Sequence, residues 1–308
     1  MNSSPEPSGC KTAAFFSFAH NFWPHTVVAA SSLLSFSRDL DIHIFADKIN
    51  TRWLAKLQAK AVSSGGRIHA HLFDSSLVKG LKDCGHYGLS TYYRLFVPEL
   101  LADQADRLIY LDSDMIVRSS IHELVGFDLG GSVLAAVPGF RAKDNQAHAQ
   151  RLGHGVDCPY FNAGIMIIDP QRWKRADLTR QCLAFQESHP ERIRYADQDM
   201  LNYCLAGEWK SLPLDWNVMV DSFWPVVESD LDGATLEQIT KACGNPRIIH
   251  FNGQFKPWHF TYRHPYKQAY LATRRSLQKT PYISDDFPWF LTEKLAKRLS
   301  TVIKKKSP

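Results

Sequence analysis

The stretch that decides the fold is Arg107-Leu-Ile-Tyr-Leu-Asp112-Ser-Asp114-Met-Ile-Val117, an apolar run interrupted by two carboxylates one residue apart. An apolar run of this kind is typical of a central β-strand that is covered on both faces. Unpaired charges are costly inside a core, so we expect the carboxylates at the carboxyl end of the strand, where open α/β sheets bind ligands. Two carboxylates there predict a site for Mg²⁺ or Mn²⁺, with coordination positions left for a diphosphate. Asp-x-Asp also occurs in ordinary turns, and the motif alone leaves that alternative open.

The composition is that of an ordinary soluble protein. The chain has 308 residues, of which 44% are hydrophobic and 22% charged, and this is enough for a large core. Six cysteines are spread widely without a C-x-x-C pair, which predicts reduced thiols in a cytoplasmic protein. Residues 1–10 are polar and predict a disordered N-terminus without a secretory signal. No apolar run is long enough to span a bilayer.

The net charge of +5 is concentrated at the C-terminus. Residues 291–308 carry six basic side chains and one acidic side chain, whereas the rest of the chain is balanced. We therefore expect no nucleic-acid partner for the body of the protein. The apolar residues of 287–308 fall largely on one helical face, which predicts a helical, basic amphipathic tail. Such a tail either contacts an anionic membrane surface or packs on the body with a solvated, lysine-rich end.

The first half of the chain alternates between strands and helices. Strands are expected at 11–19, 41–46, 67–73 and 107–112, and helices at 26–36, 51–62 and 91–101. This alternation predicts an α/β fold with a mainly parallel sheet, as in a single Rossmann-like nucleotide-binding domain. Further strands are expected at 133–137, 160–169 and 247–251, and further helices at 176–188 and 197–205. The domain organisation we expect is a catalytic domain at 11–265 and a C-terminal tail at 266–308.

A segment from Ile249 to His259 supplies the remaining chemistry. His250 ends a short apolar strand, where an imidazole would complete a mixed nitrogen and oxygen site that suits Mn²⁺ somewhat better than Mg²⁺. Gly253 would let the backbone approach a phosphate closely, and Lys256 would place a positive charge beside it. The alternative is a hydrogen-bonded core histidine and a solvated lysine in an ordinary turn.

Four segments, in this order, resemble the family-eight glycosyltransferases, the retaining enzymes of the lipopolysaccharide galactosyl/glucosyltransferase and glycogenin type. The segments are Ser90-Thr-Tyr-Tyr-Arg94, Tyr110-Leu-Asp112-Ser-Asp114, Phe161-Asn-Ala-Gly164 with Asp197-Gln-Asp199, and His250-Phe-Asn-Gly253 with Lys256-Pro-Trp258. The resemblance covers most of residues 11–260, and its last segment is the most specific. It implies a GT-A fold, a UDP-sugar donor and a divalent metal, usually Mn²⁺.

The resemblance also implies a role for each matching residue. The implied metal ligands are Asp112, Asp114 and His250. The residues implied to bind the nucleotide and its diphosphate are Asn21, Ser113, Gly253 and Lys256. The residues implied to lie around the donor sugar are Arg94, Asn162, Asp197 and Gln198, of which the last two are the catalytic candidates. Each also has an ordinary structural explanation, such as an ion pair for Arg94 or a helix N-cap for Asp197.

The chain departs from the family pattern after its first strand. The family often has an acid there that contacts the uracil or the ribose, whereas this sequence reads Phe18-Ala19-His20-Asn21. Backbone groups or Asn21 would then have to recognise uracil, and the base preference stays open. Residues 138–157 match no acceptor-binding pattern, and we expect a polar, loop-like lid over the donor.

Three hypotheses follow. The first is a retaining transfer of glucose or galactose from a UDP-sugar to a saccharide, with lipopolysaccharide or another glycolipid as the acceptor, at the inner face of the membrane. The second is a metal-dependent nucleotide-sugar phosphohydrolase or nucleotidyltransferase, which would need further acidic ligands for a second metal. The third is a non-catalytic nucleotide-sugar binder. The absence of a second carboxylate cluster at a strand end argues against the second hypothesis, and the intact set of Asp112, Asp114 and His250 argues against the third.

Overall fold

The computed structural model describes residues 11–85, 88–219, 230–231 and 236–277. The chain divides into two compact units, Met1–His250 and Phe251–Pro308, and each is described by itself. The predicted N-terminal segment 1–10 and the predicted amphipathic tail 287–308 lie outside the described residues.

A seven-stranded sheet forms the centre of the first unit, with the strand order β3-β2-β1-β4-β7-β6-β8. Its strands are β1 (Thr12–Phe18), β2 (Asp41–Ala46), β3 (Arg67–Leu72), β4 (Arg107–Leu111), β6 (Leu134–Pro138), β7 (Phe161–Ile168) and β8 (Lys210–Ser211). The first four strands are parallel, and β7 runs antiparallel to both of its neighbours, β4 and β6. The predicted α/β fold with a mainly parallel sheet is confirmed.

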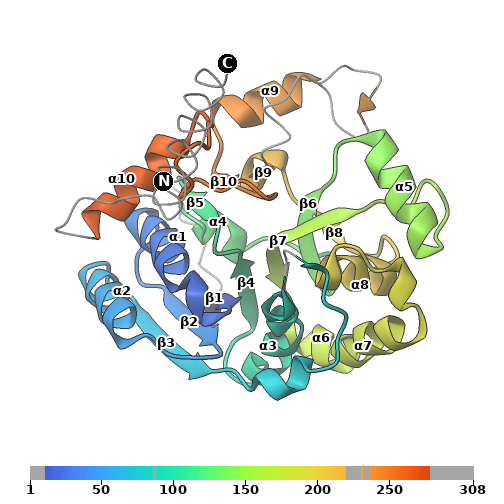
Figure 1. Ribbon diagram of the computed structural model, residues 1–308, viewed down its shortest axis with the longest axis horizontal. Helices are drawn as coiled ribbons and strands as arrows, with labels where there is room; N and C mark the ends of the chain where they lie inside the picture. Colours follow the sequence, from blue (N-terminus) through green and yellow to red (C-terminus); the bar gives the residue numbers. More distant parts are fainter. Residues whose placement is uncertain (1–10, 86–87, 220–229, 232–235, 278–308) are drawn as a thin grey trace, which may run out of the picture. The chain divides into compact units, whose positions relative to one another are not determined.

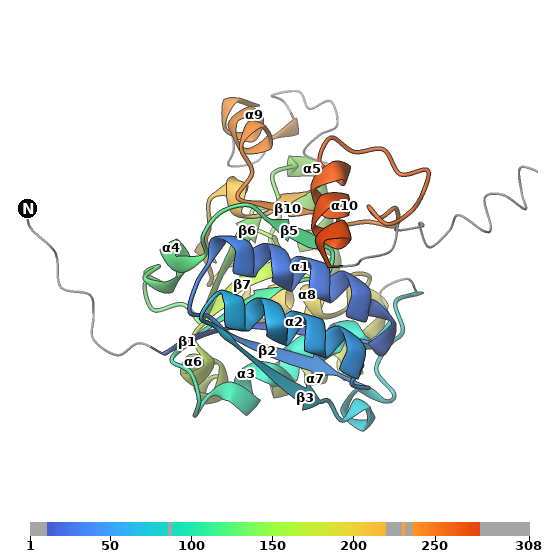
Figure 2. The ribbon, with the colours of Figure 1, turned by 90° about the vertical axis from the view of Figure 1, so that its left-hand side faces the viewer.

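Helices cover both faces of this sheet (Figure 1). The helices α1 (Trp23–Phe36) and α2 (Thr51–Ser63) lie side by side on one face, which Figure 2 shows from the front. The helices on the other face are α3 (Tyr93–Leu101), α6 (Pro170–Arg175), α7 (Leu178–Ser188) and α8 (Ala196–Leu205). Phe15 packs in the core of this second face, while Phe16, its neighbour on β1, is fully buried on the first. Burial on both faces explains why the central strands are apolar throughout.

A second sheet of three strands has the order β5-β10-β9. These strands are β5 (Met115–Val117), β9 (Val218–Met219) and β10 (Ile248–His250). The apolar run around Asp112 is therefore two strands, β4 and β5, that belong to different sheets. The Asp112-Ser113-Asp114 segment joins them, and antiparallel pairing of β10 with β5 sets His250 opposite Met115.

Residues 138–157 are not the polar loop that the sequence predicted. Ala142–Leu152 form the helix α5, which ends at Gly153 with a left-handed φ of 88°. Most of its residues are good helix formers, and it buries Asn145, Ala149 and Leu152. The other helices of this unit are α4 (His122–Val125) and α9 (Leu236–Gly244).

The described part of the second unit holds a loop and the helix α10 (Lys267–Ser276). Lys267 of α10 holds the loop against the helix, because its Nζ donates to the carbonyl oxygens of His259, Phe260 and Tyr262. Within the described ranges of both units, no helix is long and apolar enough to cross a membrane. The five cysteines in these ranges are free thiols.

Candidate donor and metal site

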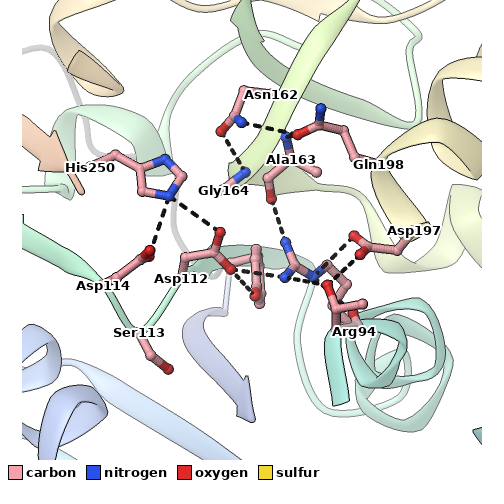
Figure 3. A network of polar contacts seen from close by, with 12 residues as sticks. Arg94, Asp112, Ser113, Asp114, Asn162, Ala163, Gly164, Asp197, Gln198 and His250 are labelled. Carbon is pink, nitrogen blue, oxygen red and sulfur yellow. Dashed lines mark hydrogen bonds and ion pairs between the residues drawn. The ribbon is translucent and has the colours of Figure 1, made fainter. Parts of the chain in front are cut away.

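Three of the predicted site residues converge where the chain passes from one sheet to the other. His250 Nε2 lies 3.3 Å from Asp114 Oδ1 and 3.5 Å from Asp112 Oδ2 (Figure 3). One ligand atom from each of the three residues lies within 4.8 Å of the others. His250 and Asp114 are buried, and Asp112 is partly exposed. The structure thus places two carboxylate oxygens and one imidazole nitrogen around a common point.

A chain of hydrogen bonds fixes which nitrogen of His250 carries the proton. The backbone N–H of Gly164 donates to the side chain of Asn162 over 3.0 Å, so the atom that accepts is the amide oxygen of Asn162. Asn217 donates its Nδ2 to the same oxygen over 2.9 Å. The remaining polar atom of Asn217 is therefore its Oδ1, which lies 3.0 Å from Nδ1 of His250. The imidazole must donate from Nδ1, so in the neutral ring the lone pair lies on Nε2.

This tautomer suits a divalent cation. A lone pair that faces two carboxylates is repelled by them, and a cation between the three groups would turn that repulsion into attraction. Two carboxylate oxygens and one imidazole nitrogen are a ligand set that Mn²⁺ or Mg²⁺ accepts. Asn217 lies where the outer partner of a metal-binding histidine usually lies, a partner that orients the ring and sets its tautomer. The three residues therefore form a candidate metal-binding group.

Gly164 allows the imidazole to reach the carboxylates. A Cβ atom at this position would lie 2.4 Å from Cε1 and 2.7 Å from Nδ1 of His250, far inside van der Waals contact. Gly164 also accepts a hydrogen bond from the segment Asp112–Asp114, the candidate metal loop, because its carbonyl oxygen binds the backbone N–H of Asp112 over 2.9 Å. The Gly in the Phe161–Gly164 segment is thus required for the close approach of β7 to the ring.

Arg94 lies buried between two carboxylates. Its Nη2 is 2.9 Å from Asp112 Oδ1 and its Nε is 3.1 Å from Asp197 Oδ2, while Nη1 donates to the carbonyl of Ala163. Burial alone would lower the pKa of the guanidinium, but Asp112 and Asp197 outweigh that effect and raise the pKa above its ordinary value. The guanidinium also lies over the ring of Tyr110, whose hydroxyl donates to Asp112 over 2.5 Å. Arg94 therefore fixes the positions of Asp112 and Asp197.

Asp197 is an unusual carboxyl because burial dominates its electrostatics. Burial raises its pKa from 3.8 to about 6, although Arg94 and a 2.5 Å hydrogen bond from Thr91 both act to lower it. Its Oδ2 is buried, and its contact with Arg94 Nε is an ion pair that does not have hydrogen-bond geometry. Buried carboxyls with a perturbed pKa are common in functional sites.

The donor-sugar candidates Asn162 and Gln198 lie against each other. The Oε1 of Gln198 accepts bonds from Asn162 Nδ2 and from the backbone N–H of Ala163, both over 3.0 Å (Figure 3). Its Nε2 donates to the hydroxyl of Tyr160 over 2.9 Å. β7 and the first turn of α8 are thus joined at this point, and the Gln198 amide is held in one orientation.

Hydrogen bonds to Asp199 fix the position of α8. Arg151 of α5 donates from both terminal nitrogens to the two oxygens of Asp199, each over 2.7 Å. The hydroxyl of Tyr160 and the backbone N–H groups of Arg194 and Tyr195 donate to the same carboxylate, also over 2.7 Å. The carboxylate is fully buried and amply hydrogen-bonded, so it fixes the helix that carries Asp197 and Gln198.

The nucleotide candidates are divided between the two units. Ser113 lies in the metal loop, where its Oγ is 2.7 Å from Oγ1 of Thr26 in α1. Asn21 is exposed in the short 3₁₀ turn between β1 and α1. Gly253 and Lys256 belong to the second unit, in which Gly253 has a φ of 88° and Lys256 Nζ donates to the carbonyl of Phe251 over 2.9 Å.

Sequence reasoning missed several residues that shape this site. Asn217 directly precedes the short strand β9 and is almost fully buried, so an amide at the start of an apolar strand was the available signal. Arg151 lies in the segment that was expected to be a loop. Asp47, which follows β2, accepts two hydrogen bonds from His20 and lies beside the turn in which the sequence lacks an acid. No spacing rule connects such distant positions.

Comparison with known proteins decides the family. The sequence pattern of glycosyl transferase family 8 matches residues 13–262, which is most of the chain. The chain belongs to this family. The expectation drawn from the four sequence segments is confirmed.

Curated relatives support the same assignment. The chain is 28% identical over 251 residues to a lipopolysaccharide 1,2-glucosyltransferase of Escherichia coli K12, covering 81% of this chain and 72% of the relative. It is 24% identical over 252 residues to a lipopolysaccharide 1,3-galactosyltransferase of Salmonella typhimurium, covering 80% and 72%. The structure of the galactosyltransferase LgtC with donor and acceptor sugar analogues superposes with a TM-score of 0.76 at 24% identity, covering 88% and 97%. The fold is thus the expected GT-A fold.

Proposed function

We propose that the protein is a metal-dependent, retaining glycosyltransferase that moves glucose or galactose from a UDP-sugar to a saccharide. The observation that carries this proposal is the convergence of Asp112, Asp114 and His250 beside the Asn162–Gln198 pair. Two of the curated relatives are named as a lipopolysaccharide glucosyltransferase and a lipopolysaccharide galactosyltransferase. We therefore infer that the acceptor is a lipopolysaccharide or a related glycolipid.

Each site residue has a proposed task. Asp112, Asp114 and His250 would hold Mn²⁺ or Mg²⁺, with the tautomer of His250 set by Asn217. When bound, the metal would stabilise the charge that gathers on the departing diphosphate. Gly253 and Lys256 would bind that diphosphate, and Ser113 and Asn21 would contact the nucleotide. Lys256 would favour the transition state, since the negative charge near it grows as the glycosidic bond breaks.

The sugar side of the site favours attack from the face that the diphosphate leaves. Gln198 is an amide and a poor nucleophile, and its Oε1 already accepts two hydrogen bonds. It would therefore lie beside the reactive carbon without forming a bond to it. Arg94, Asn162 and Asp197 would keep the hexose in one position. We propose that the acceptor hydroxyl passes its proton to the departing phosphate oxygen, so that the anomeric configuration is retained.

We also infer a cytoplasmic location. In this proposal, residues 287–308 contact an anionic membrane surface, which would bring the enzyme to a lipid-linked acceptor. This part of the proposal rests on the sequence pattern of the tail and on the names of the relatives. Flotation with vesicles of anionic and of neutral phospholipids tests it, and equal recovery from both would contradict an anionic contact.

The central experiment is calorimetric titration of the purified protein with UDP, with and without Mn²⁺. We expect binding that requires Mn²⁺ and is lost in Asp112→Ala. The matched control is Asp103→Ala, because the side chain of Asp103 is 83% exposed and pairs only weakly, at 3.9 Å, with Lys174. Binding of UDP to Asp112→Ala as tight as to the wild type would remove the metal assignment.

Turnover tests the rest of the proposal. UDP-glucose and UDP-galactose are incubated with a lipopolysaccharide acceptor, and the anomeric configuration of the product is read by NMR. Retention supports the proposal, and an inverted product would exclude it. Release of phosphate or a nucleoside monophosphate without glycoside formation would instead support the phosphohydrolase hypothesis.

A further inference from the structure

A histidine–aspartate pair lies at the same sheet edge as the metal loop, on the side away from the sugar residues. β1, β2 and β4 are parallel neighbours, with Phe15 paired to Tyr110 and Phe18 to Ala46. His20, two residues after β1, and Asp47, the first residue after β2, therefore share the carboxyl edge with Asp112. In the strand order, β4 separates β1 and β2 from β7, the strand that carries Asn162.

This placement corresponds to the nucleoside end of a bound donor. A diphosphate at Asp112 and Asp114 carries the sugar at one end and the nucleoside at the other. With the sugar against Asn162 and Gln198 on the β7 side, the nucleoside extends over the ends of β1 and β2. This orientation of the donor rests on the proposed function, in which Asn162 and Gln198 contact the sugar.

The pair is joined by two hydrogen bonds, and the side chain of its histidine is largely exposed. Asp47 accepts from the backbone N–H of His20 over 2.6 Å and lies 3.1 Å from its Nδ1. The Trp23 indole donates to the carbonyl of Lys48 over 2.8 Å, which ties the segment after β2 to the start of α1. The His20 side chain is 60% exposed. An ionised carboxylate only accepts hydrogen bonds, so Nδ1 carries the proton, and in the neutral ring Nε2, across the ring, is an acceptor.

An acceptor at this position discriminates between pyrimidines. Uracil has an N–H donor at N3, whereas cytosine has a lone pair at N3. Uracil N3 would donate a hydrogen bond to Nε2 of His20. With cytosine, the lone pair of N3 would face the lone pair of Nε2 instead. Cytosine would therefore bind more weakly, because both acceptors would lose water without gaining a hydrogen bond. We infer that His20, oriented by Asp47, reads the N3 position of the donor base and selects uracil.

The test compares the affinities of UDP, CDP and 2′-deoxy-UDP, each with Mn²⁺, for the full chain. We expect the wild type to bind UDP at least about tenfold more tightly than CDP, the ratio that one such hydrogen bond provides. His20→Ala and Asp47→Ala should bring that ratio close to one. The first variant lacks the acceptor, and in the second no carboxylate holds the His20 proton on Nδ1. Circular dichroism confirms that both variants fold.

A second histidine–aspartate pair on the same strand provides the matched control. Asp41 is the first residue of β2, at the opposite edge of the sheet, and lies 3.6 Å from His69. His69→Ala should keep the wild-type ratio of UDP to CDP affinity.

Each remaining outcome is decisive. A wild type that binds UDP and CDP equally, or variants that keep the preference, would overturn the assignment of His20 and leave the proposed function intact. An altered ratio of UDP to 2′-deoxy-UDP affinity in His20→Ala, with the UDP to CDP ratio unchanged, would move the contact to the ribose and overturn base reading. Failure of the wild type to bind any of the three nucleotides would instead overturn the proposed function.

Discussion

At the scale of single residues, two backbone N–H groups determine which side-chain atoms of the site donate hydrogen bonds and which accept them. The N–H groups of Ala163 and Gly164 can only donate, so they identify the oxygen atoms of Gln198 and Asn162. The donors and acceptors in the series of hydrogen bonds from Asn162 through Asn217 to His250 follow from these assignments. A glycine at 164 is needed as well, because the histidine ring occupies the space of a side chain.

Replacement of Gly164 by alanine tests the close approach of the ring. The new Cβ would lie 2.4 Å from the imidazole, so His250 must move away from Asp112 and Asp114. We expect the affinity for Mn²⁺ to fall by roughly tenfold to a hundredfold, the range for a disturbed metal ligand. Calorimetric titration with Mn²⁺ measures this. Gly155→Ala is the control, since nothing lies within 4 Å of its added Cβ; equal affinities in the two variants would contradict the prediction.

Asp197 predicts a specific dependence of stability on pH. Its pKa is about 6 in the folded protein against 3.8 for the ordinary carboxyl, so the folded state holds the proton more tightly. The stabilisation from this group is complete below the unfolded pKa and is lost as the pH rises through about 6. Asp197→Asn serves as the reference, because an amide does not titrate in this pH range. The free energy of unfolding of the wild type relative to this variant should therefore fall by about 2 kcal/mol between about pH 4.5 and about pH 7.5.

Denaturant unfolding of the metal-free proteins at the two pH values measures this difference. Asp103→Asn is the control, because this carboxyl is exposed and makes only a 3.9 Å contact with Lys174. A constant difference between wild type and Asp197→Asn would show that Arg94 outweighs burial and that the carboxyl stays ionised.

At the scale of elements, the position of α8 depends on a helix that the sequence did not predict. The Arg151–Asp199 pair joins α5 to α8, and α8 carries Asp197 and Gln198. The buried carboxylate is acceptable only because five donors saturate it. Sequence patterns near 138–157 gave no hint of this role, since α5 exposes most of its polar side chains.

Removal of the arginine should destabilise the protein strongly. Arg151→Met leaves the Asp199 charge buried without its counter-ion, which typically costs 3–5 kcal/mol, so we expect a loss of about that size. The double variant Arg151→Met/Asp199→Asn should lose less, because no charge remains unpaired. Urea unfolding measures both. Arg180→Met, which breaks the exposed pair with Asp177, is the control and should change stability by less than about 1 kcal/mol; a similar small loss for Arg151→Met would contradict the prediction.

At the scale of the first unit, the candidate metal ligands lie at the junction of two sheets. Asp112 directly follows β4 of the seven-stranded sheet. Asp114 directly precedes β5, and His250 ends β10, which pairs with β5 in the smaller sheet. A ligand held by both sheets should stabilise the folded unit as a whole, since binding to the native state alone shifts the unfolding equilibrium.

Thermal unfolding tests this coupling. UDP with Mn²⁺ at about a hundredfold excess over the dissociation constant should add about 2.7 kcal/mol and raise the unfolding midpoint by about 4 °C. Scanning calorimetry with and without the ligands measures the shift. Asp114→Ala should unfold at the same temperature in both conditions, and a full shift in that variant would contradict a role for Asp114 in binding.

The sequence by itself determined the family, the mainly parallel α/β sheet, and the grouping of Asp112, Asp114 and His250, because apolar runs and polar residues at strand ends are local signals. It could not show that the run around Asp112 divides between two sheets, since both halves are equally apolar. It also could not reveal Asn217, Arg151 or Asp47, because their roles come from contacts with residues far away in the chain. Tertiary structure decided these, since a buried amide or carboxylate acquires its orientation and its proton affinity only from the partners that folding brings to it.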